Sequence, residues 1–188
     1  MGILAGIFVG GQSRRMGGLP KGLLRLSSGE TVVDRWRSLL EGVGVDSVLV
    51  GSVADYAPRV MLADAFPGTG PLGGLVSLLR HAELTGRARV LAVGCDMPHI
   101  PPALVMKLRD APAAAAVAPR RDERWEPMLA RYDVSRALPV ATARATRREL
   151  SMQGLLDELS AAELALTANE SFALDDWDTL TDVKRRPG

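Results

Sequence analysis

The sequence predicts an α/β fold, a three-layer α/β/α sandwich with a mostly parallel, Rossmann-like sheet. Short apolar runs alternate along the chain with segments whose apolar residues recur at helical spacing. Several of these runs are almost continuously apolar, as strands buried on both faces are. At 188 residues and 47% hydrophobic content, the chain is long enough to bury a sizeable core. We expect a single domain over residues 1–188.

The first half of the chain supplies strands and helices in alternation. Ile3–Val9 is a short β-branched run bounded by glycine, which predicts a buried strand. Thr31, with Asp34 three residues later, predicts a helix start, and apolar residues continue at helical spacing to Val43. Pro71 opens a second helix with an apolar face. Two further strands are predicted at Ser47–Val50 and Arg59–Leu62.

The second half continues the pattern. Arg89–Val93 has the apolar character of a central parallel strand, and Pro101 and Pro102 open another helix. The remaining predicted elements are strands at Ala114–Ala118 and Leu129–Tyr132, a helix at Gln153–Leu159 and a short helix from Asp178.

Composition excludes several classes of partner and site. A net charge of +1 gives no overall field that would favour nucleic acid or a membrane surface. Cys95 is the single cysteine, which rules out an intrachain disulfide and a cysteine zinc cluster. The opening "MGILAGIFVGG" lacks a basic leader region and is far shorter than the roughly 20 residues of a membrane span. We expect a cytoplasmic protein.

The stretch "GGQSRRMGGLPK" is the first candidate site. No acidic residue occurs before Glu30, whereas Arg14, Arg15, Lys21 and Arg25 all fall there. The glycines follow the first predicted strand, and in open α/β sheets ligands bind beyond the carboxyl ends of the strands. Glycines allow backbone N–H groups to approach phosphates, and the cations neutralise them. The alternative is a glycine-rich turn with solvated arginines.

Carboxylates supply the second signal. Asp96 lies in "AVGCDMPHIP" at the end of a buried strand, where a carboxylate needs a partner or a metal. One hard carboxylate with open positions suits Mg²⁺; the alternative is a turn or capping residue. The tail "DDWDTLTD" could add a second carboxylate from Asp176 or Asp178, or could simply begin a helix. His99 lies near Cys95, but we expect Cys95 to be a packed residue rather than a nucleophile.

The order of "GGQSRRMGGLPKGLL", "GPLGGL", "CDMPHIP", "WEPMLARY" and "DWDTLTDV" resembles that of the molybdenum cofactor guanylyltransferases, a branch of the nucleotidyltransferases. The resemblance spans the whole chain. It implies transfer of GMP from Mg-GTP to the terminal phosphate of molybdopterin, or of its molybdenum-loaded form, with release of pyrophosphate. The resemblance is also compatible with molybdoenzyme-assembly proteins as partners.

The resemblance also assigns residues by position. Asp96 is implied as the Mg²⁺ ligand and Lys21 as a phosphate-binding lysine. From the residues themselves we expect Arg15 and Lys21 to stabilise charge on the leaving pyrophosphate, and Asp178 could add a second carboxylate to the metal. The implied nucleotide contacts are Phe8, Val9, Gly10, Gly11, Lys21, Gly51, Asp64 and Asp96. Gly51 stands where the family usually has a nucleotide-contacting asparagine. The arginines of residues 120–131 and Arg144, Arg147 and Arg148 could bind the acidic pterin or could be solvated surface.

Base choice rests on conflicting positions. Gly10-Gly11 matches the guanylyl branch, whereas Pro20 and the Asp176-x-Asp178 tail lean toward the cytidylyl branch. We expect guanine, because a missing methyl group at Gly10 leaves room for a purine. The alternatives are a CTP-dependent molybdopterin cytidylyltransferase, another small nucleotidyltransferase, or a non-catalytic nucleotide sensor or assembly protein.

Overall fold

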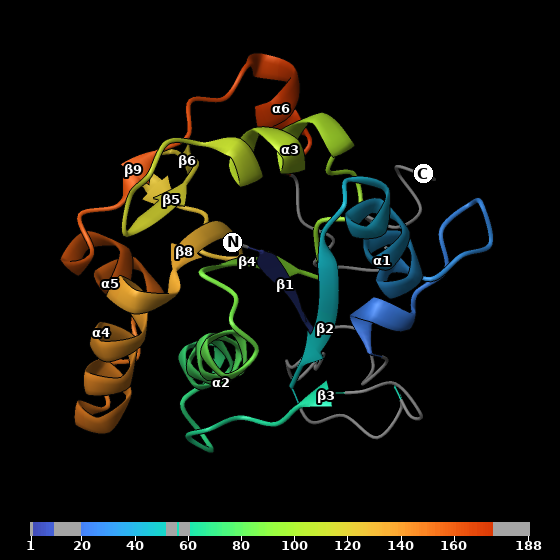
Figure 1. Cartoon of the computed structure of the whole chain (residues 1–188). Helices are drawn as coiled ribbons and strands as arrows, with labels where there is room; N and C mark the ends of the chain where they lie inside the picture. Colours follow the sequence, from blue (N-terminus) through green and yellow to red (C-terminus); the bar gives the residue numbers. More distant parts are fainter. Residues whose placement is uncertain (1, 10–19, 52–55, 57–60, 175–188) are drawn as a thin grey trace.

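The chain forms a seven-stranded sheet between two layers of helices (Figure 1). This computed structural model describes residues 2–9, 20–51, 56 and 61–174. The strand order is β3-β2-β1-β4-β8-β5-β9. The predicted three-layer α/β architecture is therefore confirmed. The strands are β1 (Ile3–Phe8), β2 (Asp46–Val50), β3 (Met61–Leu62), β4 (Arg89–Gly94), β5 (Ala116–Ala118), β8 (Leu129–Asp133) and β9 (Ala162–Glu163).

The sheet has a parallel half and a mixed half. Strands β3, β2, β1 and β4 pair in parallel. Strand β8 then runs antiparallel to both β4 and β5, and β9 pairs in parallel with β5. The chain moves outward from β1 to β2 and β3 and then returns to β4 on the other side of β1, so the switch in strand order falls between β1 and β4. Ligands of open α/β sheets bind at the carboxyl ends of strands at such a point.

Each face of the sheet has its own core. The helices α1 (Val32–Gly42) and α3 (Pro102–Asp110) cover one face, with Trp36, Leu40 and Leu104 buried there. The helices α2 (Pro71–Leu84), α4 (Val134–Arg147) and α5 (Met152–Glu158) cover the other. Figure 1 shows α2 nearly end-on beside the sheet, with α4 and α5 beyond it.

The predicted starts of the helices are confirmed by their caps. The Thr31 hydroxyl accepts a hydrogen bond from the Asp34 N–H at 3.1 Å, which fixes the first turn of α1. Pro71 and Pro102 occupy the first positions of α2 and α3, where a missing N–H costs no helical hydrogen bond. The predicted helix from Asp178 lies outside the described residues.

Helix α4 is the main element that the sequence analysis missed. It contains Pro139, a residue that usually interrupts a helix. Its buried stripe consists mainly of alanines, Ala137, Ala141 and Ala145, whose hydrophobic signal is weak. The Asp133 carboxylate accepts a hydrogen bond from the Arg136 N–H at 3.1 Å and begins the helix. The other unpredicted elements are η2 (Lys21–Leu23), the hairpin of β6 (Arg120–Arg121) and β7 (Arg124–Trp125), β9 and α6 (Ala168–Phe172).

No helix in the part of the chain that the structure describes is long and apolar enough to cross a membrane.

Candidate nucleotide site

The carboxyl ends of the parallel strands lie in one row. Phe8 is paired in register with Val50 on one side and Gly94 on the other, and Val50 is paired with Leu62. The residues that immediately follow these strand ends therefore emerge along the same edge of the sheet. This row brings Val9, Gly51, Asp64 and Asp96 to one edge, where Val9 and Asp96 follow β1 and β4, the two strands that flank the switch in strand order.

Backbone groups at this edge are already committed to the sheet. The Val9 N–H donates to the Val50 carbonyl at 3.0 Å, and the Gly51 N–H donates to the Leu62 carbonyl at 2.9 Å. The Cys95 N–H donates to the Phe8 carbonyl at 3.4 Å. Gly51 has a φ of 130°, a backbone conformation that favours glycine. Any backbone hydrogen bond from Val9 or Gly51 to a nucleotide is thus left to the carbonyl group.

Asp96 occupies the turn that follows β4. It is half-buried, and its carboxylate lies over Gly94, where the carboxylate oxygen would be 2.5 Å from a β-carbon at that position. A side chain at position 94 would therefore displace the carboxylate. Arg35 of α1 holds the same loop, because its guanidinium donates to the Pro98 carbonyl at 2.6 Å and to the Ile100 carbonyl at 3.2 Å.

Lys21 and Asp96 lie near the same thiol. Burial, together with the Asp96 carboxylate, raises the pKa of Cys95 to about 12, although the nearby Lys21 ammonium opposes this shift. Both charged groups are thus within electrostatic reach of Cys95, and the structure brings these two predicted residues together. The thiol remains protonated at neutral pH and packs against the core, as expected for a packed residue rather than a nucleophile.

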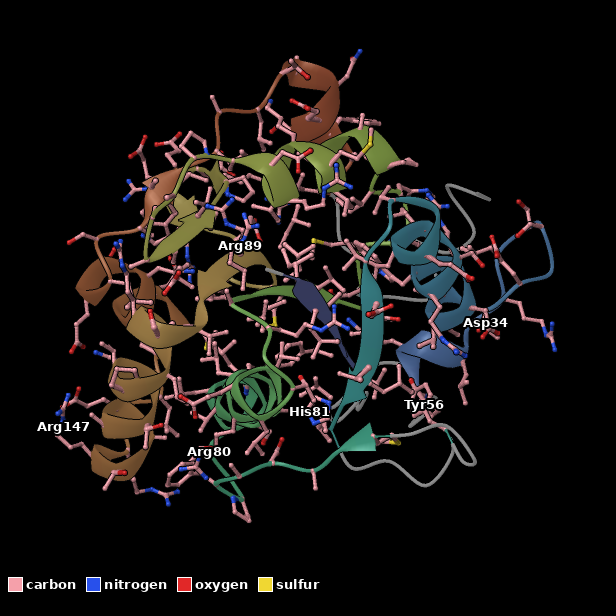
Figure 2. The ribbon with its side chains drawn as sticks, viewed as in Figure 1. Asp34, Tyr56, Arg80, His81, Arg89 and Arg147 are labelled. Atoms are coloured by element: carbon pink, nitrogen blue, oxygen red, sulfur yellow. The ribbon has the colours of Figure 1, made fainter. Side chains whose placement is uncertain are left out.

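Lys21 stands at the start of η2. Pro20 precedes it in an extended conformation, with φ −62° and ψ 118°, as the sequence predicted. A β-carbon at Gly22 would lie 2.6 Å from the Tyr56 hydroxyl, so the absence of a side chain lets η2 pack directly on buried Tyr56. Figure 2 shows Tyr56 below this segment.

Asp64 lies two residues beyond β3. Its carboxylate faces Gly74 in α2, where an added β-carbon would be 3.4 Å from the carboxylate oxygen, 2.8 Å from Val50 and 2.9 Å from Phe8. Burial raises the pKa of Asp64. Among the described residues, no side chain forms a hydrogen bond or ion pair with this carboxylate, which therefore suits a ligand that donates hydrogen bonds.

The described residues contain no group of three or more His, Cys, Asp and Glu side chains that could hold a metal ion. A single carboxylate nonetheless fits Mg²⁺, which keeps several waters and takes further oxygens from phosphates. Asp96 offers such a carboxylate. The other predicted residues of the site, Gly10, Gly11, Arg15, Asp176 and Asp178, lie outside the described residues.

Among the arginines considered for the acidic acceptor, four are paired with carboxylates in the described structure: Arg120, Arg121, Arg144 and Arg147. Arg147 contacts Glu149 through two hydrogen bonds, of 2.9 and 3.2 Å. Figure 2 shows Arg147 on α4, at the opposite side of the molecule from Tyr56. The other ion pairs are Arg120–Glu123, Arg121–Glu126, Arg144–Glu158 and Arg144–Glu149. These pairs favour the surface interpretation over an acceptor site.

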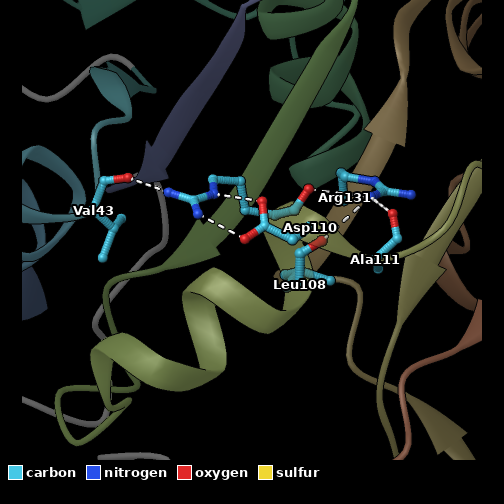
Figure 3. A network of polar contacts seen from close by, with 6 residues as sticks. Val43, Leu108, Asp110, Ala111 and Arg131 are labelled. Atoms are coloured by element: carbon cyan, nitrogen blue, oxygen red, sulfur yellow. Dashed lines mark hydrogen bonds and ion pairs between the residues drawn. The ribbon is translucent and has the colours of Figure 1, made fainter.

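The guanidinium of Arg131 forms its hydrogen bonds within the fold itself. Its side chain is 1% exposed and donates to the carbonyl groups at the end of α3 (Figure 3). The acceptors are Leu108 at 3.5 Å, Arg109 at 3.2 Å, Pro112 at 2.5 Å and Ala111. Burial lowers its pKa, although it remains a cation. The cation satisfies the carbonyl groups that a helix leaves unpaired at its C-terminus.

Curated relatives match almost the whole chain. The chain is 33% identical to a probable molybdenum cofactor guanylyltransferase from Opitutus terrae, over 97% of this chain and 94% of the relative. It is also 33% identical to the molybdenum cofactor guanylyltransferase of Xanthomonas euvesicatoria, over 87% of this chain and 83% of the relative.

Solved structures share the fold. The molybdopterin-guanine dinucleotide biosynthesis protein A of Archaeoglobus fulgidus superposes with a TM-score of 0.76 at 22% identity, covering 97% of this chain and 95% of that one. The 2-C-methyl-D-erythritol 4-phosphate cytidylyltransferase of Thermus thermophilus superposes with a TM-score of 0.66 at 14% identity, covering 96% and 95%. The sequence profile described as "MobA-like NTP transferase domain" matches residues 5–161. The chain belongs to this family of nucleotidyltransferases.

Proposed function

We propose that the protein transfers GMP from GTP to the terminal phosphate of molybdopterin or the molybdenum cofactor, with release of pyrophosphate. The observation that carries the proposal is the placement of Asp64 and Asp96 at the carboxyl ends of the parallel strands, with Lys21 near Asp96. This arrangement occurs in a chain that matches named guanylyltransferases along nearly its full length. The names of these relatives also favour GTP over CTP.

The reaction needs no side-chain nucleophile. The attacking group is a phosphate that is already ionised, so no general base is required. Its oxygen forms a bond to the α-phosphorus of GTP while the bond to the pyrophosphate oxygen breaks. The protein then contributes alignment and charge neutralisation.

The residues divide these tasks. Lys21, together with Arg15, neutralises the pyrophosphate, and Asp64 orients the nucleoside. Asp96 is the residue that would hold Mg²⁺. When bound there, the metal would neutralise charge on the phosphate oxygens. Because the pKa of Cys95 is raised to about 12, a covalent thiol intermediate is not part of the proposal.

Competition among the four nucleoside triphosphates tests the proposal. Each is supplied with molybdopterin and Mg²⁺, and pyrophosphate release and dinucleotide formation are measured. We expect GTP to be preferred and turnover to stop when the metal is chelated. A preference for CTP would overturn the guanine assignment but not the chemistry. Binding of GTP without turnover would instead support the sensor alternative.

A further inference from the structure

Ser77 makes an unusual set of contacts for a serine within a helix. It lies in α2, half-buried, on the side that faces the segment after β3. Its hydroxyl oxygen accepts a hydrogen bond from the Ala65 N–H at 2.7 Å. The same oxygen lies 2.7 Å from the Ala63 carbonyl and 3.1 Å from the Gly73 carbonyl.

A hydroxyl has one proton to donate, so the two carbonyl groups compete for it. A helical serine usually bonds to the carbonyl four residues earlier, which here is that of Gly73. The distance to Ala63 is shorter, and Ala63 belongs to a different segment of the chain. The hydroxyl thus joins α2 to the segment after β3 through both its donor and its acceptor.

These two contacts bracket Asp64. The Ala63 carbonyl precedes Asp64 and the Ala65 N–H follows it, so one hydroxyl fixes the backbone on both sides of the residue. The position of a side chain follows from the backbone that carries it. The Asp64 carboxylate is consequently held against the first turns of α2.

The space around the carboxylate makes this position matter. Gly74 lets α2 approach Val50 and Phe8 so closely that a β-carbon there would lie under 3.0 Å from both side chains. The carboxylate lies beside this contact, at the carboxyl ends of β1 and β2. It is partly desolvated, as its raised pKa indicates. A small shift of the segment would move it away from the edge where a nucleoside binds.

We propose that Ser77 is a positioning residue that holds Asp64 so that its carboxylate can accept hydrogen bonds from N–H or O–H groups of the bound nucleoside. The proposal rests on the proposed function, because the nucleoside is that of the triphosphate substrate. Ser77 itself touches no substrate. Its hydroxyl acts through the backbone of residues 63–65.

The test compares Ser77→Ala, Ser77→Thr and a control, Thr85→Ala. Thr85 directly follows the last residue of α2, and its hydroxyl donates to the His81 carbonyl at 2.8 Å, four residues earlier and within the helix. Ser77→Ala is expected to weaken GTP binding about tenfold, because the hydrogen bonds of this half-buried hydroxyl to residues 63 and 65 are lost. The KM for GTP should rise while kcat stays nearly constant. Ser77→Thr keeps the hydroxyl and should restore most of the affinity, and Thr85→Ala should bind GTP as the wild type does.

A second measurement does not depend on activity. Hydrogen exchange at the Ala65 amide reports directly on the bond to Ser77, and it should accelerate in Ser77→Ala but not in Thr85→Ala. Unchanged exchange, or an effect on melting temperature with normal GTP affinity, would overturn the proposal.

A double-mutant cycle with Asp64→Asn tests whether Ser77 acts through Asp64, separately from whether the protein binds GTP. If Ser77 acts through Asp64, then Ser77→Ala should add little to the loss of GTP affinity that Asp64→Asn already causes. Fully additive losses would contradict the positioning role. The wild type itself could fail to bind GTP while hydrogen exchange at Ala65 responds to Ser77→Ala as expected. In that case the proposed function is wrong, but the hydrogen bonds between Ser77 and residues 63–65 are confirmed.

Discussion

The two halves of the sheet use their charged residues differently. In the parallel half, β3-β2-β1-β4, Asp64 and Asp96 follow strand ends at one edge, and Lys21 acts electrostatically on the thiol beside Asp96. In the mixed half, β8-β5-β9, the buried guanidinium of Arg131 donates hydrogen bonds to four backbone carbonyl groups. A buried charge such as that of Arg131, which backbone groups already satisfy, is therefore weaker evidence for a ligand site than a carboxylate such as that of Asp64, with which no described side chain forms a hydrogen bond or ion pair.

Substitution of Asp96 is expected to have the largest effect. Asp96→Ala should lower turnover at least ~100-fold, on the scale of removing one key electrostatic group from an active site. The fold should be retained, because the carboxylate lies in a turn after β4 rather than within the core. Turnover and circular dichroism on the same preparation check both expectations.

Asp46→Ala is the matched control for Asp96→Ala. Asp46 belongs to the same parallel half but begins β2 at the opposite edge, where it pairs with Arg87 at 2.6 Å. Its loss should leave turnover unchanged. Near-normal Mg-dependent turnover in Asp96→Ala would reject the metal assignment.

Arg131→Met tests the mixed half. Loss of the guanidinium leaves buried carbonyl groups unsatisfied, so we expect about 2 kcal/mol less free energy of unfolding. Turnover per folded molecule should be unchanged, because Arg131 serves the end of α3. Denaturant titration and activity at a temperature where the variant is folded check this. If Arg131→Met kept its free energy of unfolding but lost activity, Arg131 would serve a ligand rather than the fold, and the contrast between the two halves would be wrong.

Lys21→Ala, which tests the parallel half again, should have a smaller effect. We expect triphosphate binding to weaken about tenfold, because one charge-assisted contact to phosphate is lost. The melting temperature should change little. Titration with GTP and with guanosine separates the two parts of the ligand, since guanosine has no phosphates and should bind both forms equally. Early melting with normal GTP affinity would assign Lys21 to the fold instead.

The sequence could predict the parallel half because its signals are local. Near-continuous apolar runs gave β1, β2 and β4 to within one or two residues at each end, and Asp96 could be placed from its position after such a run. Asp64 came only from the resemblance, because β3 is two residues long in the described part of the chain. Helix α4 was missed because Pro139 and a stripe of alanines conceal its amphipathic pattern.

The supporting contacts could not be predicted, because they join distant parts of the chain. Arg35 reaches the loop of Asp96 across 63 residues, and Ser77 reaches Ala65 across 12. Nothing in the local sequence distinguishes Arg35 from an ordinary surface arginine of a helix. The same holds for Arg131, because the sequence of β8 alone does not indicate on which face of the sheet its side chain lies. Only the packed structure reveals which cations and hydroxyls fix other residues in place.

Arg147→Gln should have the smallest effect and decides the remaining interpretation of the surface arginines. Arg147 is half exposed and already shares both guanidinium contacts with Glu149, whose pKa is lowered by this pairing. A paired charge at the surface attracts a further anion only weakly, so we expect the KM for molybdopterin to stay within about twofold of wild type. Measurement at two salt concentrations sharpens the test, because binding of an acidic acceptor by Arg147 would make the wild-type KM more salt-dependent than that of the variant. A larger rise in KM would assign the acceptor to α4 and would show that the mixed half also holds charge for a ligand.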